Sequence, residues 1–250
     1  LYYNLETFYI IFISFLYLLY FYLCLKYILI MIKLPNILIS TLIFIIILKL
    51  IWNIFDDNFK FNIINKLNLW FSTESMSGDG SEIQNTKVIS NILPKIIKKY
   101  KIKTLFDCPC GDMNYMSKIL EKNLKIKYTG GDIVQKLVII NRKKYPIYKF
   151  IHFDIINNKI SKYDLIIVKD LLNHISFSNI QKILSNIKKS GSKYLLLNNH
   201  NKTLKNKIHF KARAPFWIDI NWNLDPWKKL NIIKNFNSDN KDHDYVLIKL

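Results

Sequence analysis

A ten-residue segment, Thr104-Leu-Phe-Asp-Cys-Pro-Cys-Gly-Asp-Met113, constrains the fold of this chain more than any other part of its sequence. A short apolar run ends in Asp107, a tight turn with Pro109 and Gly111 follows, and a helical pattern starts at Asn114. Open α/β sheets bind ligands at such turns, outside the carboxyl ends of the strands, and glycine allows close approach because it has no Cβ. The segment therefore predicts a ligand-binding turn, with a nucleotide-like ligand as the first hypothesis.

Strand and helix patterns alternate on the carboxyl side of this turn, and a helix pattern precedes it. This alternation predicts an α/β fold, a Rossmann-like, doubly wound and mostly parallel sheet of seven strands that ends in a C-terminal antiparallel hairpin. The predicted strands are 103–107, 126–132, 148–154, 163–169, 192–197, 230–235 and 244–249, and the predicted helices are 82–100, 115–124, 135–144 and 177–189.

The N-terminal part has a different character. Apolar runs cover residues 8–32, interrupted by Lys26, and residues 37–52, interrupted by Lys49. A membrane helix needs roughly 20 mostly apolar residues, so residues 1–55 are predicted to form a membrane anchor of one or two transmembrane helices. A connector, 56–70, and a globular domain, 71–250, follow. Two alternatives are buried core helices, and a start of translation at Met31 that would place residues 1–30 upstream of the protein.

The charge and the cysteine content of the chain indicate which macromolecules, metals and redox compartment it suits. The chain carries 37 Lys and Arg residues against 18 Asp and Glu, a net charge of +19. Such a charge attracts acidic partners, but the lysines are dispersed, so nucleic-acid binding is possible without support from a compact basic patch. Cys108 and Cys110 are one residue apart, a spacing that fits neither an ordinary disulfide nor a zinc site. No metal site is predicted, and the globular part is expected in a reducing compartment.

Four acidic residues stand at or just beyond the ends of predicted strands: Asp107, Asp132, Asp154 and Asp170. A single aspartate at such a place is often a helix cap or a turn former. Four at one edge of a sheet favour a binding site. Asp132 follows Asp107 by 25 residues, close to the spacing at which nucleotide-binding folds place the acid that binds ribose hydroxyls.

Three motifs carry a resemblance to a known family. They are Ser77-Gly-Asp-Gly-Ser81, Asp107-Cys-Pro-Cys-Gly-Asp112 and Asp170-Leu-Leu-Asn-His174. Their order resembles that of class I S-adenosylmethionine (SAM)-dependent methyltransferases, and most closely a poorly characterised subgroup with an SGxGS loop and a DxPCGD turn. The resemblance covers roughly residues 74–200. It implies a membrane-anchored methyltransferase with SAM as cofactor, an unidentified methyl acceptor, and a C-terminal domain in the cytosol, where the cofactor is found.

The resemblance also implies roles for individual residues. The turn would border the methionine and ribose of SAM, Asp132 would bind the ribose hydroxyls, and Ile133, Asp154 and Ile155 would meet the adenine. Asp170 and His174 would lie near the methyl group and the acceptor, with His174 as the leading general base and Asp170 as a second base or a positioning group. The implied cofactor-binding residues are thus Asp107, Cys110, Gly111, Asp112, Asp132, Ile133, Asp154 and Ile155.

Two other functions stay open. Pro109 and Met113 stand where the family usually has glycines, which allows a non-catalytic membrane-associated protein on a methyltransferase scaffold. An NAD(P)-binding oxidoreductase is the second, although the turn lacks the Gly-x-Gly-x-x-Gly pattern of dinucleotide sites. The loop at residues 72–81 is either a linker or a cover for the ligand. The aromatic and basic residues of 209–227 either line an acceptor pocket or pack behind the sheet.

Overall fold

The computed structural model describes residues 22, 26, 37–52, 54–122, 125–208, 214, 216–238 and 244–250. The chain divides into two compact units, Leu1–Phe55 and Asp56–Leu250. The first contains the apolar helix α2 (Ile37–Trp52), which matches the second apolar run of the sequence. The described part of the chain contains no helix with the length and apolar character that a membrane crossing requires. Most of the first apolar run, 8–32, lies outside the described residues.

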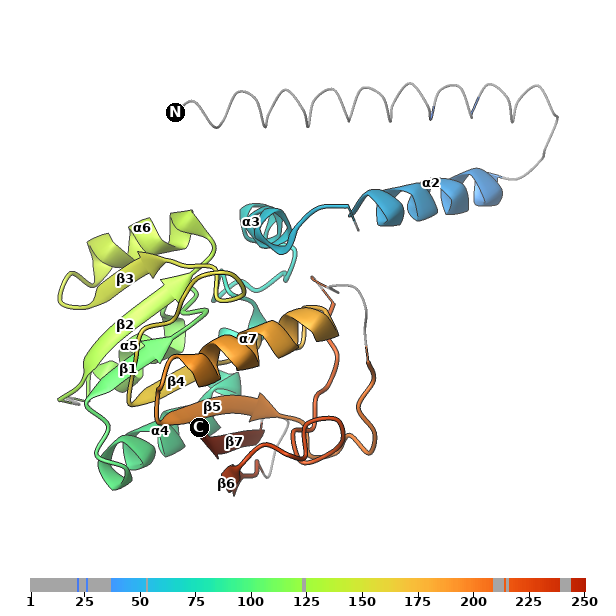
Figure 1. Cartoon of the computed structure of the whole chain (residues 1–250). Helices are drawn as coiled ribbons and strands as arrows, with labels where there is room; N and C mark the ends of the chain where they lie inside the picture. Colours follow the sequence, from blue (N-terminus) through green and yellow to red (C-terminus); the bar gives the residue numbers. More distant parts are fainter. Residues whose placement is uncertain are drawn as a thin grey trace. The chain divides into compact units, whose positions relative to one another are not determined.

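The second unit is built on one sheet of seven strands in the order β3-β2-β1-β4-β5-β7-β6 (Figure 1). The first five strands are parallel, and β7 lies antiparallel between β5 and β6. The predicted parallel sheet with a C-terminal antiparallel hairpin is therefore confirmed. The strands are β1 (Thr104–Asp107), β2 (Lys127–Asp132), β3 (Lys149–His152), β4 (Leu165–Val168), β5 (Tyr194–Asn199), β6 (Ile232–Phe236) and β7 (Asp244–Lys249).

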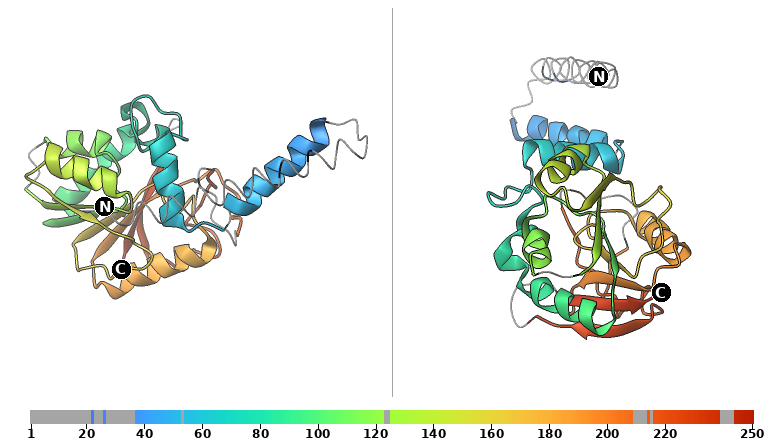
Figure 2. Two further views of the ribbon diagram at one scale, coloured as in Figure 1. Left: turned by 90° about the horizontal axis from the view of Figure 1, so that it is seen from above. Right: turned by 90° about the vertical axis from the view of Figure 1, so that its left-hand side faces the viewer.

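Helices cover both faces of this sheet. In Figure 2, α4 and α5 lie on one side of the strands and α7 on the other, while α6 packs against β2 and β3. The predicted ranges of α6 and α7 are confirmed, whereas the predicted helix 82–100 is split. The helices are α3 (Asp57–Leu67), η1 (Asp79–Ser81), η2 (Ile83–Asn85), α4 (Lys87–Lys99), α5 (Asn114–Leu120), α6 (Gln135–Lys144) and α7 (Phe177–Lys189).

The sequence explains why these elements pack as they do. Strand β4, Leu-Ile-Ile-Val, is buried along its whole length, as expected for a central parallel strand covered on both faces. Helix α4 presents Ile89, Leu93 and Ile96 to the core, at the spacing of one helical face. Helix α7 is capped by Ser176, the residue before its first turn, whose hydroxyl accepts a hydrogen bond from the Asn179 backbone N–H.

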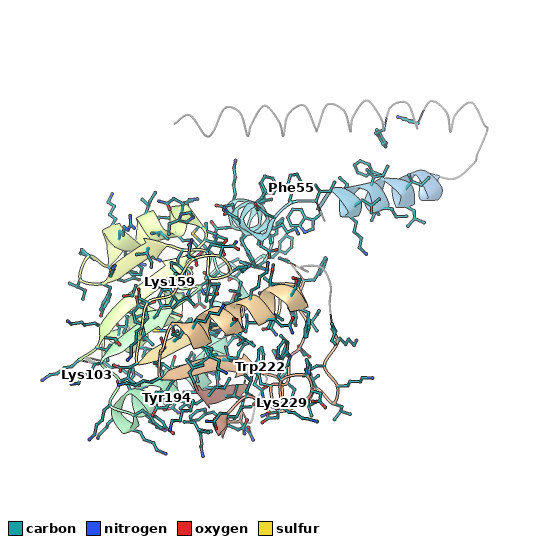
Figure 3. The ribbon with its side chains drawn as sticks, in the orientation of Figure 1. Phe55, Lys103, Lys159, Tyr194, Trp222 and Lys229 are labelled. Carbon is teal, nitrogen blue, oxygen red and sulfur yellow. The ribbon has the colours of Figure 1, made fainter. Side chains whose placement is uncertain are left out.

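The strand order places a crevice at the carboxyl ends of the parallel strands. From β1 the chain continues outward to β2 and β3, and it then returns to the other side of β1 as β4. Ligands of such sheets bind where the order reverses, because the turns there diverge. Figure 3 shows the direction of the neighbouring strand: Tyr194 starts β5, and Trp222 lies near the other end of that strand.

Candidate active site

Asp107 is the last residue of β1 and is fully buried. The Tyr128 hydroxyl donates a hydrogen bond to Asp107 Oδ2 at 2.8 Å, whereas Asp107 Oδ1 has no hydrogen-bond partner among the described residues. Burial raises the pKa of the Asp107 carboxyl to about 7. An orphaned buried carboxylate oxygen is costly, so it marks a place where a ligand group that donates hydrogen bonds would be stabilising.

A cavity of about 80 Å³, here called the strand-end cavity, lies at the carboxyl ends of β1, β2 and β4. Each of these strands contributes the residues that directly follow or end it. Asp107 is not part of the lining, whereas four other residues that the resemblance implies at the cofactor are: Cys110, Gly111, Asp132 and Ile133. The lining from the strand ends consists of Pro109, Cys110, Gly111, Asp132, Ile133, Val134, Lys169, Asp170 and Leu171.

Asp132 is one of the two aspartates that line this cavity. Its Oδ2 accepts the Gly111 backbone N–H at 2.9 Å, and its Oδ1 accepts the Val134 backbone N–H at 2.9 Å. Burial raises its pKa to about 6, so the carboxylate is ionised at neutral pH. Each oxygen still has a lone pair available, because a carboxylate accepts about four hydrogen bonds. Asp132 therefore holds the β1 turn and remains able to bind two ligand hydroxyls.

Asp112 points to the loop at residues 72–81 and not into the cavity. Its carboxylate accepts the Met76 backbone N–H at 2.7 Å and the Ser75 hydroxyl at 3.0 Å. In return, the Ser77 hydroxyl accepts the Asp112 backbone N–H at 3.0 Å. Gly111 permits this packing, because a Cβ there would lie 2.2 Å from the Ser77 Oγ, and its φ of +56° is a conformation that favours glycine. These hydrogen bonds hold the loop at residues 72–81 against the turn that follows β1.

Lys169 is a functional candidate that the sequence analysis missed. This buried lysine follows β4 and lines the strand-end cavity. Its Nζ donates to the Gly80 carbonyl at 2.7 Å and to the Asp170 carboxylate, and it lies 5.4 Å from the centre of the Tyr115 ring. A buried ammonium requires such partners. A lysine directly after a fully apolar strand, and directly before an aspartate, was the available signal.

Asp154 and Ile155 lie apart from the cavity lining. The Asp154 carboxylate accepts the Ile156 backbone N–H at 2.8 Å and the Asn157 side-chain amide at 2.7 Å. These are the bonds of an aspartate that forms its own turn. Ile155 is buried in the core. Their contact with adenine stays a prediction.

His174 faces a second cavity. Its Nδ1 lies 2.8 Å from the Phe216 carbonyl oxygen, and its ring is 5.8 Å from that of Trp70. Burial lowers the pKa of His174 below the usual 6.5, so the ring is neutral at pH 7. A nitrogen beside a carbonyl oxygen must carry the proton, so Nε2 holds the lone pair. Nε2 has no hydrogen-bond partner among the described residues, which leaves it available as a base.

This second cavity, here called the loop cavity, has a volume of about 530 Å³. It is formed by the 77–80 loop, the segment after β4, the 199–203 loop and parts of the C-terminal region. It shares Trp70, Ser77 and Asp170 with the strand-end cavity, so the two adjoin. Asp170 has a φ of +54°, and its backbone N–H donates to the Asn198 side chain at 3.0 Å. It stands at the boundary between the two cavities.

The aromatic residues near the C-terminus divide between the two roles that the sequence allowed. Trp217 lines the loop cavity. Trp222 and Trp227 are buried, with ring centroids 5.4 Å apart, and the Trp222 indole donates to the Asn198 carbonyl. Phe216, another candidate of this segment, is 70% exposed, and Phe210, Lys211 and Arg213 lie outside the described residues.

The segment 56–70, predicted as a connector, also contributes to the site. Phe61 and Asn65 of α3 line the strand-end cavity, and Trp70 lines both cavities. The Asn65 amide donates to the Met76 carbonyl at 3.2 Å, which ties α3 to the loop. No ligand pattern in the sequence marked these residues.

The cysteines of the turn are packing residues. Cys108 and Cys110 are buried and are not joined in a disulfide. Burial raises the pKa of both thiols well above the usual value, which keeps them protonated. Within the described residues, no cluster of three or more histidine, cysteine or acidic side chains is arranged to hold a metal ion.

Comparison with solved structures finds this fold in methyltransferases. Magnesium protoporphyrin IX methyltransferase from Synechocystis PCC 6803 with bound SAH is 12% identical, with a TM-score of 0.53 over 80% of this chain and 98% of that chain. The same enzyme with bound SAM is 16% identical, with a TM-score of 0.51 over 78% and 97%. Human N-acetylserotonin methyltransferase in complex with SAM is 11% identical, with a TM-score of 0.50 over 66% and 52%.

These comparisons confirm the resemblance of fold to class I SAM-dependent methyltransferases. With sequence identities of 11% to 16%, this similarity is a similarity of fold. No protein-family model matches the chain, and a search of curated proteins finds no match either.

Proposed function

We propose that this chain is a SAM-dependent methyltransferase that binds SAM in the strand-end cavity and its acceptor in the loop cavity. One observation carries the proposal: two cavities adjoin at the carboxyl edge of a methyltransferase-type sheet, with Asp170 lining both. Together they fall within the ~300–1,000 Å³ typical of ligand sites. A donor and an acceptor held there would be neighbours.

The residues of the strand-end cavity fit SAM. Asp132 has lone pairs for the two ribose hydroxyls, and Gly111 presents bare backbone to the ligand. Similar folds with bound SAM or SAH support this choice of cofactor. SAM supplies a methyl group on a positively charged sulfur, which a nucleophile displaces.

The remaining task of the protein is to align the acceptor and to accept its proton. Correct alignment of reacting groups is worth up to about 7–11 kcal/mol in favourable cases. The neutral His174, with its lone pair on Nε2, is the candidate general base. Asp170 is paired with the buried Lys169, so we assign it a positioning role at the boundary between donor and acceptor.

The test is calorimetric titration of the full chain with SAM, with NADH as the competing ligand. The proposal predicts a single SAM site and no NADH binding. Folded protein that binds NADH in place of SAM would support the oxidoreductase alternative. SAM binding without production of S-adenosylhomocysteine, in the presence of a complete cell extract, would support a non-catalytic protein on this scaffold.

We also propose that the N-terminal unit attaches the enzyme to a membrane, with the globular unit on the cytosolic side. The support is the apolar sequence of residues 8–32 and 37–52 and the need for a cytosolic cofactor. Cell fractionation with an alkaline carbonate wash tests it. Recovery of the full chain in the washed supernatant would contradict this attachment.

A further inference from the structure

The lysines that are dispersed along the sequence gather at one edge of the folded sheet. This edge lies at the amino ends of the parallel strands, opposite the two cavities, and we call its surface the amino-edge face. It holds seventeen Lys and Arg residues but only two acidic residues, Glu121 and Asp164. Nearly half of the 37 basic residues of the chain thus lie in 33 of its 250 residues. The segments of the face are 98–103, 118–122, 125–127, 142–149, 162–164, 188–193 and 249–250.

Five exposed lysines of this face lie in a row along the edge of the sheet, one from each of five strands in a run of six. In strand order they are Lys149, Lys127, Lys103, Lys193 and Lys249. The Lys127 backbone N–H donates to the Lys103 carbonyl at 2.7 Å, and Lys249 pairs with Tyr194 in the ladder of β5 and β7. Figure 3 shows Lys103 and Tyr194 at this edge. Neighbouring strands are about 4.8 Å apart, so the row is about 24 Å long.

Helix ends explain only part of this charge. The helices α4, α6 and α7 each have two or three basic residues in the last turn, where a cation compensates the negative end of the helix dipole. The lysines of the row stand beside strands, and sheets have only small net dipoles. Asp164 pairs with Lys193 at 2.7 Å, but no carboxylate of the described residues pairs with the other four lysines of the row.

Acidic residues gather at the opposite edge of the sheet. Four aspartates line the loop cavity, and Lys202 is the one lysine or arginine among its described lining residues. A uniform excess of lysine would not separate the charges in this way. Like charges on one face repel each other and destabilise the compact state, so a polyanion bound at the amino-edge face would relieve this repulsion.

Tyrosines lie between the lysines of the amino-edge face. Tyr100, Tyr145 and Tyr194 are half-buried there. The ammonium groups of Lys99 and Lys144 lie 5.4 and 5.2 Å from the ring centres of the tyrosines that follow them. Proteins that bind single-stranded nucleic acid combine basic side chains for the phosphates with aromatic rings on which bases stack. The face has both kinds of side chain.

An anionic membrane surface fits this face less well. Helices that lie on membranes insert apolar side chains into the lipid, and the large apolar side chains exposed on the described face are Ile147 and Leu250. The N-terminal unit, our proposed membrane attachment, continues into α3 at the other edge of the sheet. There the Asp57 carboxylate accepts a hydrogen bond from the amide of Asn179, in the first turn of α7.

We propose that the amino-edge face binds single-stranded nucleic acid, with its lysines on the phosphates and its tyrosines against the bases. The sequence predicted no compact basic patch, because the lysines of the face come from segments that are far apart along the chain. This binding is separate from methyl transfer, since the face and the two cavities lie at opposite edges of the sheet. It therefore does not depend on the proposed function.

The experiment measures binding of the full chain to a fluorescent single-stranded RNA of about 20 nucleotides by anisotropy, at salt concentrations from about 50 to 200 mM. The triple variant Lys103→Gln, Lys127→Gln, Lys149→Gln removes three lysines of the row. Each lost phosphate contact lowers the slope of log affinity against log salt by about 0.7. The slope should therefore fall by about 2, and the affinity at the lowest salt by about tenfold or more. The matched control Lys66→Gln, Lys136→Gln, Lys205→Gln removes three exposed lysines outside the face and should stay within about twofold.

Three results would overturn the inference. The first is an equal loss of affinity in the two triple variants, and the second is a lack of RNA binding by the folded full chain at the lowest salt. The third is loss of sedimentation with phosphatidylserine vesicles in the row variant while its RNA affinity is kept, which would make the face a lipid-binding surface. A duplex of the same length that binds more tightly than the single strand would contradict the role of the tyrosines.

Discussion

The strand-end cavity and the loop cavity are built in different ways. The first is bounded largely by residues that end or directly follow β1, β2 and β4, where the sheet itself fixes their positions, together with residues of α3 and of the 70–81 segment. The second takes its wall from loops that lie more than a hundred residues apart, such as those at Gly78 and Thr203. This difference indicates that the parallel sheet positions the residues of the proposed cofactor site, whereas loops position those of the proposed acceptor site. Changes in one cavity should therefore leave the binding function of the other intact.

The variant His174→Gln should distinguish the functions of the two cavities most strongly. A general base contributes about 10²–10⁴ in rate, so the methyl-transfer rate should fall by that factor while SAM affinity stays within about twofold. Glutamine keeps a polar side chain but cannot take the proton. Radiometric turnover and calorimetry on the same preparation measure both quantities. A rate within threefold of the unmodified chain would remove His174 from the role of base.

Asp132→Asn tests the other cavity. Each hydrogen bond between a ligand hydroxyl and the carboxylate is worth about 1.5–3 kcal/mol, so the SAM dissociation constant should rise roughly 10- to 100-fold. The matched control is Asp154→Asn, a second strand-end aspartate that bonds within its own turn. We expect less than a threefold change there. Equal losses in the two variants would place Asp154 at the cofactor and contradict the distinction between them.

A pair of glycines isolates the contact between the turn and the loop. Gly111 and Gly191 both have a positive φ, but a Cβ would lie 2.2 Å from Ser77 Oγ at Gly111 and meet nothing within 4 Å at Gly191. Alanine at either place pays about 1–2 kcal/mol for the left-handed conformation. Gly111→Ala should in addition displace the loop and weaken SAM binding about tenfold. Urea unfolding of both variants measures the cost of the left-handed conformation, and SAM titration of both measures the effect of displacing the loop. An unchanged SAM affinity in Gly111→Ala would contradict this role of the loop.

The pH dependence is expected to be the smallest effect. Transfer should fall on the acid side with a midpoint below pH 6.5, because burial lowers the pKa of His174. SAM affinity should weaken below about pH 6, where Asp132 gains a proton. Rates at saturating and at limiting SAM distinguish the two. A rate at saturating SAM that rises as the pH falls would rule out a neutral histidine base.

Fold stability should follow a related pattern. Burial raises the pKa of Asp107 to about 7 and that of Asp132 to about 6, so the folded state binds these protons more tightly than the unfolded state. These two groups therefore stabilise the fold progressively as the pH falls from about 7 to 4. Asp164, whose pKa is lowered to about 2 by hydrogen bonds and Lys193, acts in the opposite sense, and its contribution is lost below pH 4. Urea unfolding between pH 2 and 7.5 measures the sum of the three contributions.

Much of the strand-end cavity could be predicted from the sequence, because its residues follow apolar strands directly. Asp132 is an example, since the end of β2 fixes its place. Met113 shows how the turn is preserved without the usual glycine. It adopts a φ of +64°, a conformation that glycine favours, and the Tyr128 hydroxyl contacts its sulfur at 3.0 Å. Met113 thus adopts the left-handed conformation that a glycine at this place would favour.

The loop cavity could not be predicted in the same way. Its wall depends on contacts such as that between His174 and the Phe216 carbonyl, which are 42 residues apart in the sequence and belong to no repeating pattern. The role of Lys169 was hidden for a related reason. Its partner Gly80 lies 89 residues earlier, so no local sequence pattern indicated this contact.

The most direct test of the two-cavity account is photochemical cross-linking of the full chain with methyl-labelled SAM, followed by peptide mapping. The account predicts label in peptides from the strand ends, at residues 109–115, 131–134 or 169–171. Excess unlabelled S-adenosylhomocysteine should suppress it. Specific label confined to residues 199–208 or to α7, away from the strand-end cavity, would contradict the placement of the cofactor.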